Sequence, residues 1–313
     1  MNIRDLNLKD HLITIARRIV QIIAFLIVNY FILELIFSIN LKSLNGLIKI
    51  LPILNSPRNP FSTGAGILEY TFFFITEGIL PIFLIGLFIL IILFSNRFFC
   101  GWICPIGTIQ DACAAIPSKK RTLKVKTHNS FLKIKYIIVI LLIIIVIPLA
   151  FSKSTNLPLY IEYRDNIGDF GDKPMGYFSL SEFIFVFFPN LVKGIFQTAS
   201  LAPLFSNPIV FIISIFYIIL IVLSVWYPRV YCRYFCPFAA VSSVISEYSF
   251  LKLSRSPVRC VGRTECGICE RVCPKQIRIL DEKYEFFSGK GECNYCLKCK
   301  EACPYSAINI KLG

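Results

Sequence analysis

The sequence predicts a membrane-embedded all-α bundle of four transmembrane helices, arranged as two pseudo-repeats and followed by a small C-terminal α+β domain. Three observations support this fold class. The 313 residues are 56% hydrophobic with a mean hydropathy of +0.67, well above ordinary soluble proteins. Four stretches are apolar over roughly the 20 residues that a helix needs to cross a membrane. Eight of the 13 cysteines follow residue 250, where the chain becomes polar.

The four predicted spans cover residues 19–39, 71–94, 134–151 and 210–226. The first is too long for the apolar core of a secretion signal and is followed by no small-residue cleavage site, so we expect it to be retained. A fifth apolar stretch, residues 183–196, contains Pro189, Asn190 and Lys193. Because these residues disfavour a span, the stretch is predicted to form an interfacial or re-entrant helix on the outer face.

Basic residues predict the orientation of the bundle. Residues 95–134 carry seven Lys and Arg against one acid, Asp111, whereas residues 152–208 balance four bases with five acids. Lys and Arg near span ends stay inside the cell, so the first loop is predicted to be cytoplasmic and the second to lie outside. Both termini and all 13 cysteines then lie on the cytoplasmic side of a multi-pass inner (cytoplasmic) membrane protein, and a disulfide framework is excluded.

The net charge of +14 does not indicate nucleic-acid binding, because much of it flanks the predicted spans. Such charges meet the anionic headgroups of membrane lipid. The sequence contains no phosphate-binding Gly-rich loop and no Ser/His/Asp constellation, so no catalytic residues are predicted.

The tail, residues 248–313, contains two cysteine runs that repeat after 30 residues. "CNYCLKCKEACP" has the Cys-x2-Cys-x2-Cys-x3-Cys-Pro spacing of bacterial ferredoxins, and the tail resembles a two-cluster [4Fe–4S] ferredoxin. In such proteins the last cysteine of each run serves the other cluster. One cluster is then assigned to Cys260, Cys266, Cys269 and Cys303. The other is assigned to Cys293, Cys296, Cys299 and Cys273.

One position departs from the ferredoxin pattern. Cys260 lies six residues before Cys266, whereas the pattern places a cysteine three before, where this chain has Arg263. The three extra residues could loop out and still deliver the thiolate of Cys260. The alternative is a cluster with only three cysteine ligands. A zinc ribbon is disfavoured because it has no use for the Cys-x3-Cys-Pro extension.

Two Cys-x3-Cys-Pro motifs also follow predicted spans directly, as "FCGWICP" with Cys100 and Cys104 and as "YCRYFCP" with Cys232 and Cys236. Each is preceded by an arginine and followed by a predicted helix that begins at the proline. The membrane part is therefore interpreted as a duplication. Four segments result: a first transmembrane half (1–115), a basic linker (116–130), a second transmembrane half (131–247) and the ferredoxin-type domain (248–313).

With "FCGWICPIGTIQDA" and "YCRYFCPFAAV", four spans and a ferredoxin tail, the chain resembles the NapH-type membrane ferredoxins of nitrate respiration and the polyferredoxin part of NosR. The resemblance covers nearly the whole chain. It implies electron transfer linked to the quinone/quinol pool, as a subunit of an oxidoreductase system in anaerobic respiration. The spacing of the motifs does not itself indicate quinone.

Ligand number suggests a third iron–sulfur cluster at the membrane surface. Each Cys-x3-Cys-Pro motif offers only two thiolates, so we hypothesise that Cys100, Cys104, Cys232 and Cys236 share one cluster. Alternatively, each half-site works separately with borrowed ligands, or only positions a partner protein. Cys113, nine residues after Cys104, is interpreted as a packing residue.

Haem is not expected, because His11 and His128 are the only histidines and both are predicted outside the bilayer. Two carboxyls, Glu34 and Glu77, fall within predicted spans. They are candidates for proton exchange with a quinone, although snorkelling at the interface explains them equally well.

The sequence thus predicts a membrane-bound iron–sulfur protein that passes electrons between quinol and redox partners. Twelve Lys and Arg against seven acids after residue 250 favour an acidic partner. The alternative is an assembly, maturation or redox-sensing ferredoxin that reduces a metal ion or a thiol for another complex.

Overall fold

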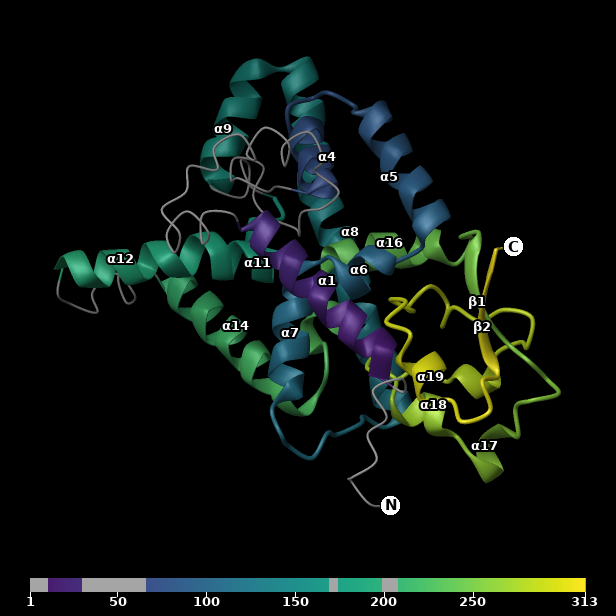
Figure 1. The fold of residues 1–313 in the computed structure, drawn as a ribbon. Coiled ribbons are helices and arrows are strands. Elements are labelled where there is room, and N and C mark those ends of the chain that lie inside the picture. Colours follow the sequence, from purple (N-terminus) through teal and green to yellow (C-terminus); the bar gives the residue numbers. More distant parts are fainter. Residues whose placement is uncertain (1–10, 30–65, 169–173, 199–207, 313) are drawn as a thin grey trace.

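The computed structural model describes residues 11–29, 66–168, 174–198 and 208–312. These residues are mainly helical, and Figure 1 shows long helices on one side of the molecule and the small cysteine-rich tail on the other. The helical architecture and the small α+β tail agree with the predicted fold class, and the helical residues up to 246 are called the membrane part here after that prediction.

The first half of the membrane part contains five described helices: α1 (Leu12–Val28), α4 (Ile67–Thr76), α5 (Ile82–Ser95), α6 (Phe98–Trp102) and α7 (Pro105–Ala115). The prediction of one span over residues 71–94 is wrong, because α4 and α5 are separate helices that pack side by side. Gly78 takes a positive φ of 73° between them, and Pro81 caps α5. Only the beginning of the predicted span 19–39 lies within the described residues, as part of α1.

The second half is built from α8 (Val125–Thr155), α9 (Leu157–Ile167), η3 (Gly176–Phe178), α11 (Leu180–Glu182), the π-helical turn η4 (Phe183–Phe187), α12 (Phe188–Thr198), α14 (Pro208–Trp226), α15 (Val230–Tyr234) and α16 (Pro237–Ser246). Helix α8 contains the predicted span 134–151, and α14 contains the span 210–226. Pro148 lies inside α8 without ending it.

Two helices of the described residues, Val125–Thr155 and Leu180–Gln197, have the length and hydropathy that crossing a membrane requires. The second of these contains the stretch for which we expected an interfacial or re-entrant helix. The count of four spans therefore stays a prediction.

The centre of the predicted outer loop packs into the interior rather than on the surface. Leu180 and Phe183 are buried. The hydroxyl of Tyr231, next to the second motif, donates to the carbonyl of Phe178 at 2.8 Å and accepts from the backbone N–H of Leu180 at 3.1 Å. The segment with Phe178 and Leu180 therefore contacts the second motif through Tyr231.

The tail forms a compact α+β unit. Strands β1 (Leu251–Arg255) and β2 (Ile308–Leu312) pair antiparallel, with Leu251 opposite Leu312. Between them lie four short helices: α17 (Gly262–Glu265), α18 (Ile268–Arg271), η5 (Ile279–Asp281) and α19 (Lys298–Glu301). A small core that includes Leu253 and Phe287 stabilises the unit. The backbone N–H of Phe250 donates to Leu93 O at 2.8 Å, which fixes the tail to the end of α5.

Candidate functional site

Each Cys-x3-Cys-Pro motif occupies a short helix, a turn and the start of a second helix. Cys100 lies on α6, and Cys104 is the N-cap of α7, with Pro105 in the first turn. In the second copy, Cys232 lies on α15 and Cys236 is the N-cap of α16. Proline is favoured at this place because its missing N–H would have no partner there. The second cysteine of each motif therefore meets the positive end of a helix dipole.

The structure brings the four motif cysteines close together. Burial raises the pKa of the Cys104 thiol, and the charges of Cys232 and Cys100 raise it further. Burial likewise raises the pKa of Cys236 to about 12, again with contributions from Cys232 and Cys100. Such effects require short distances, so cysteines of the two motifs, 128 and 136 residues apart in the sequence, lie near one another across the two halves.

The donor chemistry of this set fits an iron–sulfur cluster. Cys104, Cys232 and Cys236 are buried, and Cys100 is half-buried. Within the described part of the chain, no three His, Cys, Asp or Glu side chains come close enough to hold a single metal ion. A four-iron cube takes one thiolate at each iron, so its ligands stand further apart than those of one ion.

Asp111 on α7 is buried among three arginines beside the first motif. Nε and Nη2 of Arg229 donate to its two carboxylate oxygens at 2.8 and 2.7 Å. Arg17 and Arg18 lie 3.5 and 3.6 Å from the same carboxylate. Burial raises the pKa of Asp111, but Arg229 and Arg17 together hold it well below its usual value. Arg229 also donates to the carbonyl of Cys100 at 2.9 Å and so joins the second motif to the first.

A second buried carboxylate, Glu292, comes from the tail and lies among three cations, one of which is Arg97 of the first motif. Nη1 of Arg97 lies 3.2 Å from Glu292 Oε2, and Lys275 Nζ lies 3.8 Å from the same oxygen. Lys135 of α8 forms an ion pair with Oε1. Burial raises the pKa of Glu292, but Arg97 and Lys275 lower it to about 2. Arg97 and Arg229 each precede the first cysteine of a motif by three residues, so the internal repeat relates the two charge clusters.

Several hydrogen bonds end on cysteine sulfurs. Nε2 of Gln110 on α7 donates to Cys232 Sγ at 2.9 Å. In the tail, the backbone N–H of Ala307 donates to Cys303 Sγ at 3.4 Å. Hydrogen bonds of this kind stabilise negative charge on a cluster and tune its reduction potential.

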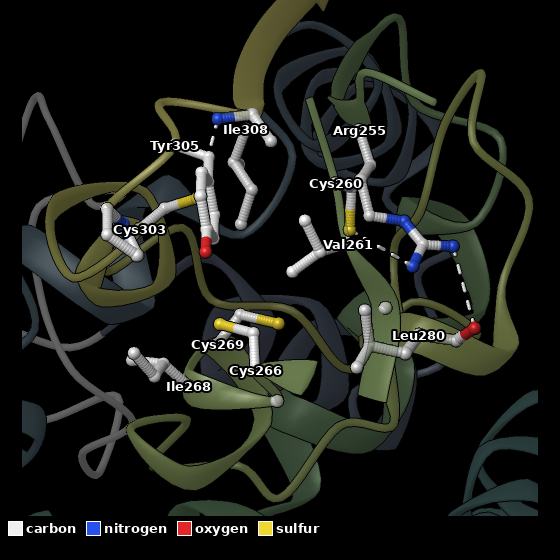
Figure 2. A pocket seen from close by; sticks show the side chains of 14 residues that line it. Arg255, Cys260, Val261, Cys266, Ile268, Cys269, Leu280, Cys303, Tyr305 and Ile308 are labelled. Carbon is white, nitrogen blue, oxygen red and sulfur yellow. Dashed lines mark hydrogen bonds between the residues drawn. The ribbon is translucent and has the colours of Figure 1, made fainter. Parts of the chain in front are cut away.

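The first predicted ferredoxin set surrounds one cavity of the tail. Cys260, Cys266, Cys269 and Cys303 all line it. Figure 2 shows Cys266 and Cys269 together on one side, with Cys260 and Cys303 on other sides of the same space. Val261 and Gly262 belong to the same wall. The residues between Cys260 and Cys266 include the helical turn α17, and Cys260 lies at the cavity with the other three cysteines, as the four-cysteine alternative requires.

The second predicted set also comes together. Burial raises the pKa of the Cys299 thiol, and the charges of Cys296, Cys293 and Cys273 are the next largest causes. These are the three cysteines that the exchange rule pairs with Cys299. Cys273 reaches this set from the other run, as the ferredoxin pattern requires.

Both Cys-x3-Cys-Pro motifs contact residues that neighbour the second set in the sequence. In the first motif, Trp102 Nε1 donates to Tyr295 O at 2.8 Å, and a Cβ placed on Gly101 would lie 2.1 Å from Asn294 O. In the second motif, the carbonyl of Cys232 accepts from Lys275 Nζ at 2.9 Å. The loops next to Cys273, Cys293 and Cys296 therefore lie directly against the two half-sites.

The remaining predicted residues lie apart from the cysteine sets. Glu77 sits between α4 and α5 and forms an ion pair with Lys153, with Arg164 3.9 Å away. Proton exchange at Glu77 and snorkelling at the interface both stay predictions. Glu34 lies outside the described residues. Cys113 is half-buried on α7, where burial raises its pKa and no described cysteine contributes.

Sequence reasoning missed the buried charges around the half-sites. Asp111 carried a signal, because it is the one acid in a loop with seven bases. The repeated arginines at Arg97 and Arg229 were a second signal. No signal in the sequence pointed to Glu292, because it pairs with an arginine 195 residues away in the sequence.

Comparison with known proteins supports an iron–sulfur assignment for the membrane motifs. A family described as a 4Fe–4S binding domain matches residues 77–124 and again residues 209–255. Each match contains one Cys-x3-Cys-Pro motif. No solved structure matches the chain.

Several relatives share about a quarter of their residues with this chain. Two uncharacterized proteins of Methanocaldococcus jannaschii are 25% and 26% identical over 76% and 71% of this chain, and the matches cover 74% and 75% of their own lengths. YccM of Escherichia coli K12, named for electron transport, is 25% identical over 70% of this chain and about half (52%) of its own length. The regulatory protein NosR of Stutzerimonas stutzeri is 22% identical over 72% of this chain but only 26% of its own length. The paired 4Fe–4S domain matches and the similarity to YccM and NosR together confirm the resemblance to NapH/NosR-type 4Fe–4S proteins.

Proposed function

We propose that this protein is a membrane-bound electron-transfer protein that connects the quinone/quinol pool to a redox partner in the cytoplasm through three [4Fe–4S] clusters. The observation that carries the proposal is the contact of both motifs with the loops beside one ferredoxin-type cysteine set. Loops next to Cys273 and Cys296 lie against the two half-sites, so a continuous path from the membrane surface into the tail needs no movement of the tail.

The third cluster would be held by the four motif cysteines. They are the only thiols of the membrane part besides Cys113, and they influence one another's pKa across the two halves. A [4Fe–4S] cluster with four thiolates carries net negative charge. The two charge clusters can compensate this negative charge, because each contains three cations and only one carboxylate, Asp111 or Glu292.

The order of electron transfer follows from these contacts. The motif cluster would exchange electrons with the set of Cys273, Cys293, Cys296 and Cys299, and this set with the set of Cys260, Cys266, Cys269 and Cys303. The last set would face a soluble partner. The surplus of basic residues in the tail favours an acidic partner surface.

A membrane location is supported by apolar side chains that remain exposed on several helices. Ile82 and Phe83 of α5, Ile144 of α8 and Ile212 of α14 are all more than 60% exposed. Faces of this kind are typical of contact with lipid. The cytoplasmic side of the cysteines rests on the basic loop 95–134, and quinone as the membrane carrier rests on the family resemblance.

Redox-titrated EPR of the purified full chain, with iron and protein analysis, tests the proposal. Three cubes require about 12 irons per chain, and a short-chain quinol should reduce the motif cluster first. A protein that binds about eight irons with both tail clusters full would contradict the third cluster. Full clusters that no quinol reduces would contradict the link to the quinone pool.

A sensing or regulatory role is the second candidate. It is favoured by the name of NosR, a regulatory protein, although the match covers only 26% of that protein. In this case the clusters would report the redox state of the membrane to another protein. Slow quinol oxidation, far below the turnover of a respiratory subunit, together with redox-dependent capture of a partner would favour it.

A further inference from the structure

A cavity of about 520 Å³ lies between the membrane part and the tail. Its walls come from the start of α1, the end of α7, the linker after α7, the second motif and the α18 and α19 regions. The volume falls in the range of small-ligand sites, roughly 300–1,000 Å³. A ligand here would therefore be a small molecule or the headgroup of a larger one, rather than a folded protein.

The lining of the cavity carries a surplus of positive charge. The linker, the second motif and the tail each contribute basic side chains: Lys120, Arg121, Arg233, Arg271 and Lys298. Within the described part of the chain, none of the five forms an ion pair with an acidic residue. Of the two acids in the lining, Asp111 is paired with Arg229. The cavity therefore suits an anionic ligand.

Arg233 is the buried cation of this lining. It is only 1% exposed, and its Nε has no hydrogen-bond partner among the described residues. Its Nη atoms donate to Gln276 Oε1 at 2.6 Å and to the carbonyls of Pro228 and Pro274. These partners fix the guanidinium in place but carry no negative charge. A buried cation without a counter-charge is costly, so an anion in the cavity would stabilise this arrangement.

The cavity lies at the ends of two helices that expose apolar side chains. Its lining includes His11, directly before α1, and Pro228, two residues after the end of α14. Helix α7 packs against both helices (Figure 1). About half or more of the surface of the following side chains is exposed: Ile19, Ile22 and Ile23 on α1, and Ile212, Ile218 and Ile219 on α14. Apolar surface of this kind is typical of contact with lipid.

Trp226 marks the level at which α14 would leave the membrane. It is the last residue of α14 and is 38% exposed. Its carbonyl accepts from the backbone N–H of Arg121 at 2.9 Å, and the carbonyl of Val225 accepts from Lys120 Nζ at 2.8 Å. Tryptophan is enriched where membrane helices meet the headgroups. The linker cations of the cavity are thus held at the depth of the lipid phosphates.

We propose that this cavity binds the headgroup of an anionic phospholipid of the cytoplasmic leaflet, with the acyl chains along the exposed faces of α1 and α14. The proposal rests on the membrane location in the proposed function. Basic pockets beside membrane helices on the cytoplasmic side bind such headgroups. Because Arg271 and Lys298 belong to the tail, whereas Lys120 and Arg121 belong to the linker, one bound lipid also joins the tail to the membrane part.

Native mass spectrometry of the cluster-loaded full chain, delipidated in a neutral detergent, tests the binding. The probes are phosphatidylglycerol and phosphatidylcholine with the same acyl chains, and glycerol 3-phosphate as a free headgroup. We expect phosphatidylglycerol to bind at least about tenfold more tightly than phosphatidylcholine, because choline brings a positive charge to the basic lining. Equal affinity for the two lipids, or no binding of either, would overturn the proposal. Displacement of the lipid by an equal concentration of glycerol 3-phosphate would also overturn it, in favour of a soluble phosphate ligand.

A pair of double variants locates the site. Arg121→Gln with Arg271→Gln removes two exposed cations of the cavity, whereas Lys119→Gln with Lys126→Gln removes two exposed cations of the same basic loop that do not line it. The first pair should weaken phosphatidylglycerol binding about tenfold or more with the iron content unchanged. The second pair should leave binding unchanged. Equal weakening by both pairs would indicate general attraction to the loop and refute the site.

Limited proteolysis near residue 250 measures whether the lipid joins the tail to the membrane part. Phosphatidylglycerol added to the delipidated chain should slow cleavage severalfold, phosphatidylcholine should not, and the cavity variant should lose this protection. Equal cleavage with and without phosphatidylglycerol would refute the role in docking. A chain that binds no lipid at the cavity but holds about 12 irons that quinol reduces would refute this proposal and leave the proposed function intact.

Discussion

The two half-sites have the same sequence pattern, but the carboxylate that binds the arginine of each comes from a different part of the chain. In both, an arginine three residues before the first cysteine is fully buried and binds a carboxylate. Arg229 of the second half finds its carboxylate within the membrane part, at Asp111 of the first half. Arg97 of the first half finds it outside, at Glu292 of the tail.

The sequence explains the difference. Asp111 lies seven residues after Cys104, and the residue seven after Cys236 is Ser243, which has no charge. Gly291 packs against the carbonyl of Ser243, since a Cβ there would lie 1.9 Å from that oxygen. Its neighbour Glu292 therefore takes the place that an aspartate would occupy in a symmetric pair. The two arginines of the repeat therefore take their carboxylates from different parts of the chain.

The cysteines give the largest test of whether the halves act as one site. Cys104→Ser and Cys232→Ser remove a ligand from different halves, and each should lose about four of 12 irons, because one cube needs all four thiolates. Iron analysis and EPR measure this. Cys113→Ser serves as the control and should keep all irons. If the losses of the two variants differ, or their combination loses about twice as much as either alone, the halves do not share a cluster.

Removal of either acid should be the next largest effect. Asp111→Asn and Glu292→Gln each leave buried cations without a counter-charge, which costs about 3–5 kcal/mol. The two variants should differ in which segment of the chain becomes less protected. Limited proteolysis should cut the segment near residue 250 faster in Glu292→Gln than in Asp111→Asn, because Glu292 is the one of these two acids that forms ion pairs between the tail and the membrane part. Equal protection of this segment in both variants would contradict the role of Glu292.

A bulkier residue at the contact between motif and tail should have a moderate effect. In Gly101→Ala the new Cβ would lie 2.1 Å from Asn294 O, so the backbone of the tail must move away. Electron transfer from the motif cluster into the tail should slow at unchanged iron content, as rapid-freeze EPR can measure. Gly86→Ala is the matched control, because nothing lies within 4 Å of the added Cβ. An unchanged rate in Gly101→Ala would place the electron path elsewhere.

Loss of a single hydrogen bond to sulfur should have the smallest effect. Gln110→Leu removes the donor to Cys232 Sγ and also the oxygen that accepts from the backbone N–H of Tyr231 at 3.1 Å, so its effect on stability is measured beside the potential. The potential of the motif cluster should fall, because the donor stabilises the more negative reduced form. The expected cost is on the order of 1 kcal/mol, which is roughly 40 mV for one electron. Ser242→Ala, at the corresponding place of the second half, removes only a bond to Ala239 O and should leave the potential unchanged.

Much of the helical part could be predicted from the sequence, because hydropathy is a local pattern, and the cysteine sets proposed from their spacing lie close together in the structure. The N-cap positions of Cys104 and Cys236 followed from the proline after each. The break between α4 and α5 was missed, because an apolar stretch of 24 residues outweighed Gly78 and Pro81 in the hydropathy pattern. Long-range pairs such as Arg97 with Glu292 depend on how the domains dock, and no local pattern records that.

The pairing of Arg97 with Glu292 has a consequence for biosynthesis. The acid is synthesised 195 residues after the arginine that needs it. Until the tail emerges and folds, Arg97 and Lys135 have no buried counter-charge, and water must remain around them. The first half-site therefore closes only in a full-length chain, and a truncated product would leave its cysteines open to solvent and to oxidation. The contact between Arg97 and Glu292 thus requires that the tail is synthesised before the first motif is protected.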